Sequence, residues 1–324
     1  FWLQMRISKM EVPAANLLIK GQSTDSFASS APKLSDALDT YCRLKGGGRS
    51  KQFFSTAKRN VGSVIGRLGD RPIDTYTSSN AADYRDWLLA QNLTKSSIKR
   101  MFGTIRAVFT LTIQEQGLGC QNPFARTYLA PVDEVKRYCI SNKDIKRIQK
   151  ICLDMADERR LLVALISDTG MRLSEALGLS WDDIYHEHKN PHINLIPHPW
   201  RPLKTSSSRR LIPLVGASYQ AVKIMHRQRT TPFLFNSYTD EKVCNGNSCS
   251  AALNKWLKQH IPDAVIHSFR HSFRDRLRNA AVQSEIIDQL GGWSNQSVGQ
   301  RYGDGYSLEK KYQVIKKIEI YSAF

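Results

Sequence analysis

Apolar residues recur with the period of an α-helix along the first third of the chain. The clearest stripe has steps of four, three, four and four residues and is formed by Ile98, Phe102, Ile105, Phe109 and Ile113. Similar spacing predicts three earlier helices, one that starts at Leu34 with Ser35 as its cap, one over 51–68 and one over 78–91. In the last of these, the residues expected to point inward are Trp87, Leu88 and Leu89.

Turn-forming residues divide the chain into segments. Residues 1–32 contain two short Gly- or Ser-rich stretches and are expected to form a loosely organised N-terminal extension. Helical spacing fills 33–122, which predicts a small helical domain. Pro123, which follows Asn122, begins the stretch 123–131, which is expected to be a linker to a second domain over 132–306. A helical tail, 307–324, follows.

The second domain combines helical spacing with one short β pattern. Residues 192–197 alternate between apolar and polar, a polar turn follows at 205–208, and a second apolar stretch covers 210–214, which is the signature of a hairpin. The rest is predicted to be helical, over 141–153, 157–168, 173–180, 218–228, 248–259, 269–280 and 283–290. The predicted fold is mainly α, with a small β-sheet or hairpin in the second domain.

Charge distinguishes this chain from an average globular protein. Lys and Arg number 47 against 29 Asp and Glu, a net charge of +18, while 41% hydrophobic residues suffice for a core. Such a surplus indicates a polyanionic partner, either nucleic acid or an anionic membrane surface. The longest aliphatic run, 161–166, is far shorter than the ~20 apolar residues of a membrane span, and the first residues do not form a signal peptide. We therefore expect a nucleic-acid partner, no membrane, and a cytoplasmic protein.

Basic residues of the helical domain lie beside its apolar stripes. Those expected to contact DNA are Lys58, Arg59, Lys95, Lys99, Arg100 and Arg106; the alternative for each is an ordinary solvated surface position. The six cysteines form no C-x-x-C pair and no Cys/His set with zinc spacing, so we expect free thiols and no metal.

Four places in the second domain contain residues that can do chemistry. Arg172 follows Thr-Gly-Met at the joint between two predicted helices, and Glu175 lies three residues on, where it could orient the guanidinium. The alternative is a surface arginine beside a helix-capping glutamate. Lys204 lies at the tip of the predicted hairpin, where a lysine is either a solvated charge or a mobile ammonium for a neighbouring site.

The other two places follow later in the chain. His267, Arg270 and Arg274 lie on one side of a helix, at steps of three and four, opposite an apolar stripe. Two glycines precede Trp293, and Tyr302 follows it nine residues later. Taken alone, H-x-x-R is a weak motif, and a tyrosine in such a place is more often a packing residue than a nucleophile.

Together, and in this order, the four motifs resemble the tyrosine recombinases, the phage integrase family. The resemblance covers about 140–305, and the preceding helical part resembles more weakly that family's core-binding domain. It implies a two-domain clamp around DNA whose catalytic residues are Arg172, Lys204, His267, Arg270, Trp293 and Tyr302. Trp293 falls where most members have His and a minority Trp. Glu175 matches the family's acidic supporting residue, and Tyr306, the rival nucleophile, has the wrong spacing from Trp293.

The chemistry of DNA cleavage agrees with these assignments. Two guanidiniums, Arg172 and Arg270, can clamp the non-bridging oxygens of a phosphodiester through paired N–H donors. Tyr302, with an ordinary pKa near ~10, needs a proton acceptor, for which His267 is the candidate. Lys204 can protonate the departing 5′-oxygen. The chain has no carboxylate cluster for a two-metal nuclease and no Walker loop, so no cofactor is expected.

The resemblance implies a site-specific DNA recombinase that forms a 3′-phosphotyrosyl intermediate and integrates or excises a prophage or mobile element in a bacterial cytoplasm. The implied partners are double-stranded DNA attachment sites, a homo-tetramer on DNA, and accessory DNA-bending or directionality factors. A type IB topoisomerase-like enzyme and a non-catalytic DNA-binding regulator remain alternatives.

The tail carries an apolar stripe formed by Leu308, Tyr312, Ile315 and Ile318, with charged residues, Lys311 among them, expected opposite. This amphipathic helix docks either on its own domain or, as the resemblance suggests, on a neighbouring protomer.

Overall fold

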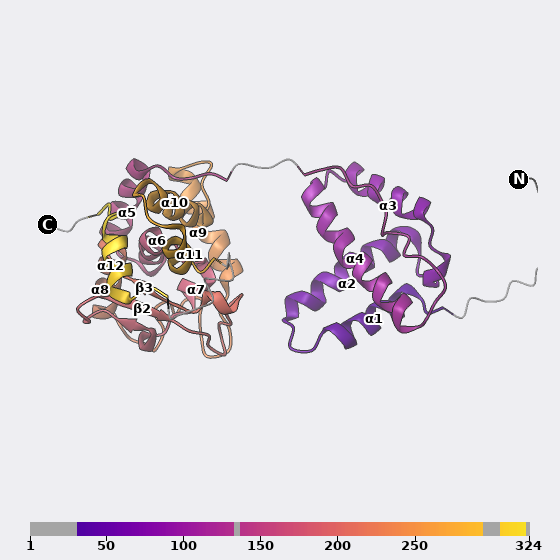
Figure 1. Ribbon diagram of the computed structural model, residues 1–324, viewed down its shortest axis with the longest axis horizontal. Helices are drawn as coiled ribbons and strands as arrows, with labels where there is room; N and C mark the ends of the chain where they lie inside the picture. Colours follow the sequence, from indigo (N-terminus) through magenta and orange to yellow (C-terminus); the bar gives the residue numbers. More distant parts are fainter. Residues whose placement is uncertain (1–30, 133–136, 294–304, 322–324) are drawn as a thin grey trace, which may run out of the picture. The chain divides into compact units, whose positions relative to one another are not determined.

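The computed structural model describes residues 31–132, 137–293 and 305–321. The chain divides into two compact units, Phe1–Glu134 and Val135–Phe324 (Figure 1). Each unit has its own hydrophobic core and is described by itself.

Unit 1 is a helical domain. Its helices are α1 (Leu34–Lys45), α2 (Lys51–Leu68), α3 (Ser78–Ala90) and α4 (Lys95–Glu115). The apolar stripe of α4 is confirmed, because Ile98, Phe102, Ile105 and Phe109 are all buried in the unit's core. Ile113 packs at the edge of that core and is only half-buried.

Two details of unit 1 differ from the sequence-based prediction. Ser35 lies inside α1 rather than at its cap; the cap is Lys33, and the Ser35 backbone N–H and hydroxyl donate to Asp70 at 3.0 and 2.7 Å. Leu89 is 46% exposed, whereas Leu88 is buried. Three consecutive helical residues span about 200° around the axis, so they cannot all face one core.

The stretch 123–131 belongs to unit 1 and is not a free linker. The Phe124 ring is fully buried among the aromatic residues of the unit's core. Arg106 donates from Nε to the Phe124 carbonyl at 2.7 Å and from Nη2 to the Thr127 carbonyl at 3.2 Å. The helical domain therefore does not end near residue 122, because these contacts fasten the following stretch to α4.

Unit 2 surrounds the buried helix α6 with further helices and a small sheet (Figure 1). Its helices are α5 (Asn142–Met155), α6 (Glu158–Thr169), α7 (Leu173–Leu177), α8 (Gly216–Arg227), α9 (Gly246–His260), α10 (Ile266–Asn279), α11 (Ser284–Gly291) and α12 (Leu308–Lys316). The strands β1 (Ile184–Tyr185), β2 (His192–Leu195) and β3 (Arg210–Pro213) form one antiparallel sheet in chain order.

The mainly α fold with a small sheet is confirmed, with two local differences. The two-residue strand β1 was not predicted, because it is too short to show an alternating pattern. The connection between β2 and β3 is a long segment with a 3-10 turn at Ser206–Ser208, not a tight hairpin.

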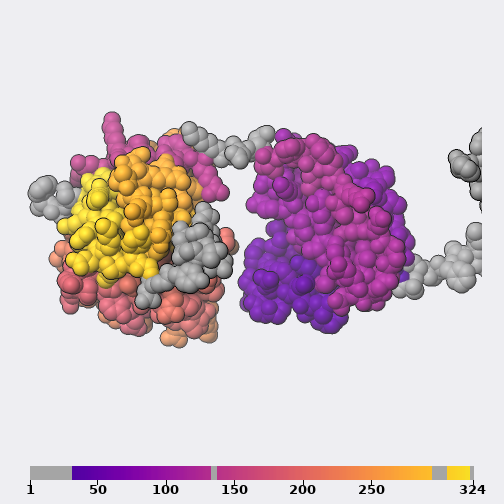
Figure 2. All heavy atoms as spheres, in the orientation of Figure 1, coloured from indigo at the N-terminus to yellow at the C-terminus, as the bar shows by residue number. Residues whose placement is uncertain are grey.

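The tail helix α12 packs on its own unit. Val314, Ile315 and Ile318 contact Phe273 and Leu277 in one apolar cluster. In Figure 2 this helix, in yellow, lies at the surface of unit 2 beside the orange stretch of α10 and α11. The structure describes the tail on its own unit, and docking on a neighbouring protomer stays a prediction.

Lys311, expected on the polar face of α12, is only 8% exposed. It precedes Val314, Ile315 and Ile318 by three, four and seven residues and therefore shares their buried face. Desolvation and then the charge of Arg210 lower the pKa of Lys311. Of the helices that the structure describes, none is long and apolar enough to cross a bilayer.

Candidate active site

The first feature of the site is the joint between α6 and α7. Gly170 ends α6 with a left-handed φ of 59°, and a Cβ there would lie 2.4 Å from the buried Phe273 ring, so the position requires glycine. Arg172 is the N-cap residue of α7. Arg172 therefore lies at the joint between α6 and α7, as the sequence predicted.

Glu175 is the carboxylate at the centre of the site. It is 3% exposed, pairs with Arg172 through the Arg172 guanidinium and backbone N–H, and accepts from Arg210 Nη2 at 3.0 Å. Burial alone would raise the pKa of Glu175, but these two arginines hold it below its ordinary value. Glu175 is thus ionised and binds Arg172 and Arg210 at the same time.

Arg270 connects the end of α6 with the end of α11. It is 2% exposed and donates to the Gly170 carbonyl at 2.6 Å and to the Gly291 carbonyl. Its guanidinium carbon lies 4.3 Å from the centre of the Trp293 ring, and that of Arg274 lies 4.7 Å from it. Burial, followed by repulsion from neighbouring arginines, lowers the pKa of Arg270 to about 9.

These contacts join four of the sequence-predicted residues into one cluster. Arg172 reaches the segment before Trp293 through its bond from Nη2 to the Gly292 carbonyl, at 3.4 Å. Arg172, Glu175, Arg270 and Trp293 therefore meet at one place, although they come from three separate parts of the chain.

His267 lies on the first turn of α10, exposed at its surface. Partial desolvation is the largest cause, followed by the neighbouring His271, Arg270, Arg137 and Arg172, and together they lower its pKa to about 4. The imidazole is consequently neutral at physiological pH, which is the form that accepts a proton.

Lys204 and the two tyrosines complete the comparison with the sequence prediction. Lys204 is exposed on the β2–β3 connection and makes no hydrogen bond or ion pair with another residue of the described part of the chain. Ser208, on the same connection, accepts from Arg172 Nη1 at 3.0 Å, so the connection reaches the cluster. Tyr302 lies outside the described residues. The Tyr306 hydroxyl donates to Gln283 Oε1 at 2.9 Å.

The basic residues of unit 1 are of two kinds. Exposed side chains on α2 and α4 are those of Lys58, Arg59, Lys95, Lys99 and Arg100, for which DNA contact stays a prediction. The Arg106 guanidinium, in contrast, donates to the two backbone carbonyls described above and so holds the stretch after α4 in place.

Comparison with known proteins identifies the family of this chain. The family model described as "Phage integrase family" matches residues 139–307, more than half of the chain. The chain belongs to the phage integrase family. The resemblance drawn from the motif order is thereby confirmed.

This integrase-family chain also has curated relatives of low sequence identity. It is 23% identical over 265 residues to the transposase from transposon Tn916 of Enterococcus faecalis. The matched region covers 73% of this chain and 65% of the transposase. It is 28% identical over 159 residues to the tyrosine recombinase XerD of Corynebacterium glutamicum, over 46% of this chain and 48% of the relative. The chain thus spans just under two thirds of the length of the Tn916 transposase.

Solved structures share the fold. The Tn1549 transposon integrase in complex with transposon right end DNA matches with a TM-score of 0.65 and 18% identity, over 88% of this chain and 99% of that one. A lambda integrase tetramer bound to a Holliday junction matches with a TM-score of 0.62 and 14% identity, over 87% and 82%. At these identities the likeness shows the fold alone.

Sequence analysis of this integrase-family chain missed one member of the cluster, Arg210. Its side chain is 3% exposed and pairs with Glu175. The strand pattern could have revealed it, because alternate residues of a strand share one face, and Arg210 alternates with Ile212 and Leu214, which are both buried. An arginine on the inward face of a strand needs a buried anion, and Glu175 provides it.

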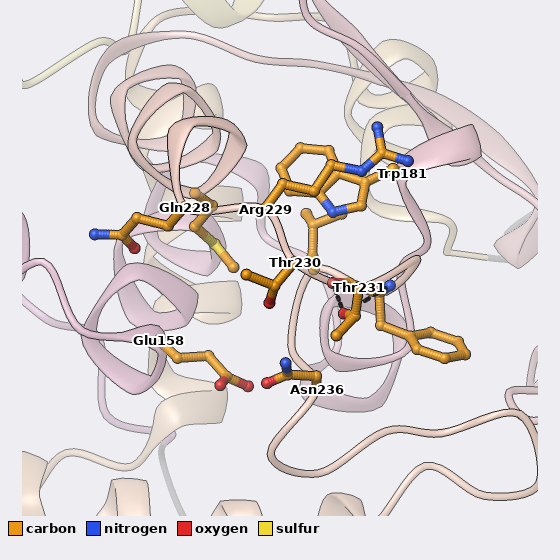
Figure 3. Close-up of a pocket in the computed structure, with 10 residues that line it drawn as sticks. Glu158, Trp181, Gln228, Arg229, Thr230, Thr231 and Asn236 are labelled. Carbon is orange, nitrogen blue, oxygen red and sulfur yellow. Dashed lines mark hydrogen bonds between the residues drawn. The ribbon is translucent and has the colours of Figure 1, made fainter.

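A separate small pocket in unit 2, of about 90 Å³, is lined by none of these cluster residues (Figure 3). Among its lining residues are Glu158, Trp181 and Arg229, and Trp181 Nε1 has no hydrogen-bond partner within the described structure. Glu158 is engaged by the Ser237 backbone and hydroxyl, at 3.0 and 2.6 Å. The pocket has room for one or a few water molecules.

Proposed function

We propose that this chain is a site-specific DNA recombinase that cuts and rejoins double-stranded DNA. The observation that carries the proposal is the cluster of Arg172, Arg210 and Arg270 around one carboxylate, Glu175. Three guanidiniums against one carboxylate leave two positive charges uncompensated in a largely buried place. Buried charge without a counterion is costly, so the cluster favours binding of an anion such as a phosphodiester.

The cluster also has donors to spare for such a phosphate. A guanidinium has five N–H donors. Within the described residues Arg270 uses two of them, on the carbonyls of Gly170 and Gly291. Arg172 uses three, on Glu175, Ser208 and the Gly292 carbonyl. The remaining N–H groups are fixed in direction by these bonds, which suits charge stabilisation at the two non-bridging oxygens of a pentacovalent phosphorus.

The proposed reaction is a transesterification. The Tyr302 oxygen attacks the phosphorus and forms a P–O bond, the bond from phosphorus to the 5′-oxygen breaks, and a 3′-phosphotyrosine results. The phenol proton passes to His267, whose neutral imidazole can take it. Lys204, exposed on its connection, gives a proton to the departing 5′-oxygen. Attack by a 5′-hydroxyl from another strand reverses these steps and rejoins the DNA.

Trp293 cannot take part in proton transfer, because an indole has only one N–H donor and does not titrate. Its ring packs against the guanidiniums of Arg270 and Arg274. We assign it the binding of a phosphate oxygen through that N–H and the orientation of Arg270.

The biological setting we propose is movement of a mobile element. A relative in sequence is the transposase from transposon Tn916, and the fold is similar to that of the Tn1549 transposon integrase, solved in complex with transposon right end DNA. By analogy with the lambda integrase tetramer on a Holliday junction, we propose four copies acting on paired attachment sites, with unit 1 and unit 2 forming a clamp around each duplex. Accessory DNA-bending or directionality factors belong to the same proposal.

A nicked suicide DNA substrate spanning the ends of the element tests this function. The nick lets the short 5′-hydroxyl fragment diffuse away after cleavage, so a covalent adduct accumulates. In EDTA and without ATP, wild type and Tyr306→Phe should give the adduct on a denaturing gel and Tyr302→Phe should not. An adduct that survives Tyr302→Phe would refute the assignment of the nucleophile. Failure of the wild type to form any adduct on DNA that it binds would favour a non-catalytic regulator.

A further inference from the structure

Arg210 connects three elements around the arginine cluster. It lies on β3 with its side chain 3% exposed. Its Nη2 donates to Glu175 on α7 at 3.0 Å, its Nε to the Leu290 carbonyl on α11 at 2.8 Å, and its Nη1 to the Ser208 carbonyl at 2.7 Å. Each of its three nitrogens thus holds a different segment.

Each of those segments in turn orients one of the arginines proposed to bind phosphate. Glu175 and the Ser208 hydroxyl both accept from Arg172. Leu290 immediately precedes Gly291, whose carbonyl accepts from Arg270. Arg210 and Arg172 therefore share one acceptor, Glu175. Arg210 also binds the carbonyl of the residue that precedes Gly291, the acceptor of Arg270.

The backbone around Arg210 is shaped to allow this arrangement. A Cβ on Gly292 would lie 2.8 Å from Arg210 Nη1 and 3.0 Å from the Ser207 carbonyl, and Gly292 has a left-handed φ of 63°. The second glycine of Gly-Gly-Trp is thus explained by close approach of the segment to Arg210.

We propose that Arg210 is a positioning residue of the strand-cleavage reaction, which holds Glu175, the β2–β3 connection and the end of α11 so that Arg172 and Arg270 face one phosphate. This inference rests on the proposed function. Arg210 is not placed in contact with DNA; it acts through its neighbours.

The effect on Glu175 gives the proposal a specific signature. The guanidiniums that act on this carboxylate are those of Arg172, Arg210, Arg201 and Arg270, the last two at longer range. Burial opposes ionisation of Glu175, and the charge of Arg210 is the largest influence that favours it. Loss of that charge therefore raises the pKa of Glu175, and protonation of Glu175 removes the ion pair that orients Arg172.

The test compares Arg210→Met, Arg210→Lys and the control Arg209→Met, which removes one exposed charge from the adjacent position. Single-turnover adduct formation on the suicide substrate is measured from pH 3 to 9, so that the acid limb of the wild type lies within the range. We expect Arg210→Met to lose activity at least ~10-fold at pH 8, as expected for a misplaced catalytic group. Its acid limb should move up by about one pH unit, the size of a typical pKa perturbation. Arg209→Met should keep the wild-type acid limb.

Arg210→Lys retains the charge but not the three-pronged contact, so we expect a rate lowered at every pH with a nearly wild-type acid limb. The double variant Glu175→Gln/Arg210→Met should lose the pH shift, because the titrating group is gone. Thermal melting checks that each variant folds. If Arg210→Met does not fold, the result for Arg210→Lys alone tests the positioning role.

Two results would overturn the positioning role: full activity of Arg210→Lys, or an equal loss of activity in Arg210→Met and Arg209→Met without a shift in the acid limb of either pH profile. In both cases adduct formation by the wild type would still support the proposed function. Absence of adduct from the wild type would overturn both.

Discussion

Replacing Gly170 by alanine tests how closely the joint before Arg172 is packed. The left-handed φ of 59° costs an alanine about 1–2 kcal/mol. The added Cβ would also lie 2.4 Å from the ring of Phe273, which is fully buried and cannot move away without displacing its own neighbours. Overpacking of this kind costs about 1–3 kcal/mol, so the free energy of unfolding of unit 2 should fall by about 2–5 kcal/mol.

Gly117→Ala is the matched control. Gly117 has the same φ of 59°, but nothing lies within 4 Å of its added Cβ, so only the conformational cost of about 1–2 kcal/mol applies. Hydrogen exchange read by mass spectrometry reports the peptides of the two units separately, so each variant is measured in its own unit. The difference between the two variants isolates the collision with Phe273.

The same substitution should also slow DNA cleavage. The Gly170 carbonyl accepts from Arg270 at 2.6 Å, so a displaced joint moves that guanidinium. A shift of about 1 Å can cost ~100-fold in rate. Equal destabilisation by Gly170→Ala and Gly117→Ala, with a wild-type rate of adduct formation, would refute the account of this joint.

Three further predictions concern charged groups. The His267 ring signals in NMR, assigned with His267→Gln, should titrate near pH 4 in the free protein; a midpoint near 6.5 would contradict the desolvated, cation-flanked environment. Arg276→Met breaks a buried ion pair with Asp168 and should cost about 3–5 kcal/mol of unfolding free energy, whereas Arg278→Met at an exposed pair should cost about 0–1. Lys204→Met should leave stability unchanged and slow cleavage, and a substrate with sulfur in place of the bridging 5′-oxygen should restore the rate, because thiolate leaves without a proton; slow cleavage of both substrates would exclude the general-acid role.

The helices and the family could be predicted from the sequence because their signals are local or ordered. Helical periodicity is set by neighbours three and four residues apart, and the bounds of α2 and α3 were predicted to within one residue. Arg172 and Arg270 were found because each lies in a motif whose position in the series is diagnostic. Their meeting in one cluster adds physical support that no single motif offered.

Features that depend on packing between distant segments escaped prediction. Arg210 looked like one of two adjacent basic residues until Glu175, thirty-five positions away, was seen to accept from it. Lys311 was placed on the polar face because its burial depends on how the α12 helix is rotated against β3 and against Phe273 and Leu277 of α10. The linker prediction failed because the burial of Phe124 depends on aromatic partners that lie on α3 and α4, far away in the sequence.

The most direct test of the central claim is to identify the residue joined to DNA. The adduct trapped on the suicide substrate is digested with nuclease and trypsin and sequenced by tandem mass spectrometry. Cleavage after Arg301 and Lys310 places both candidate tyrosines on one peptide, 302–310, whose fragments distinguish them. We predict a nucleotide on Tyr302. A nucleotide on Tyr306 or on Ser307 would contradict the account.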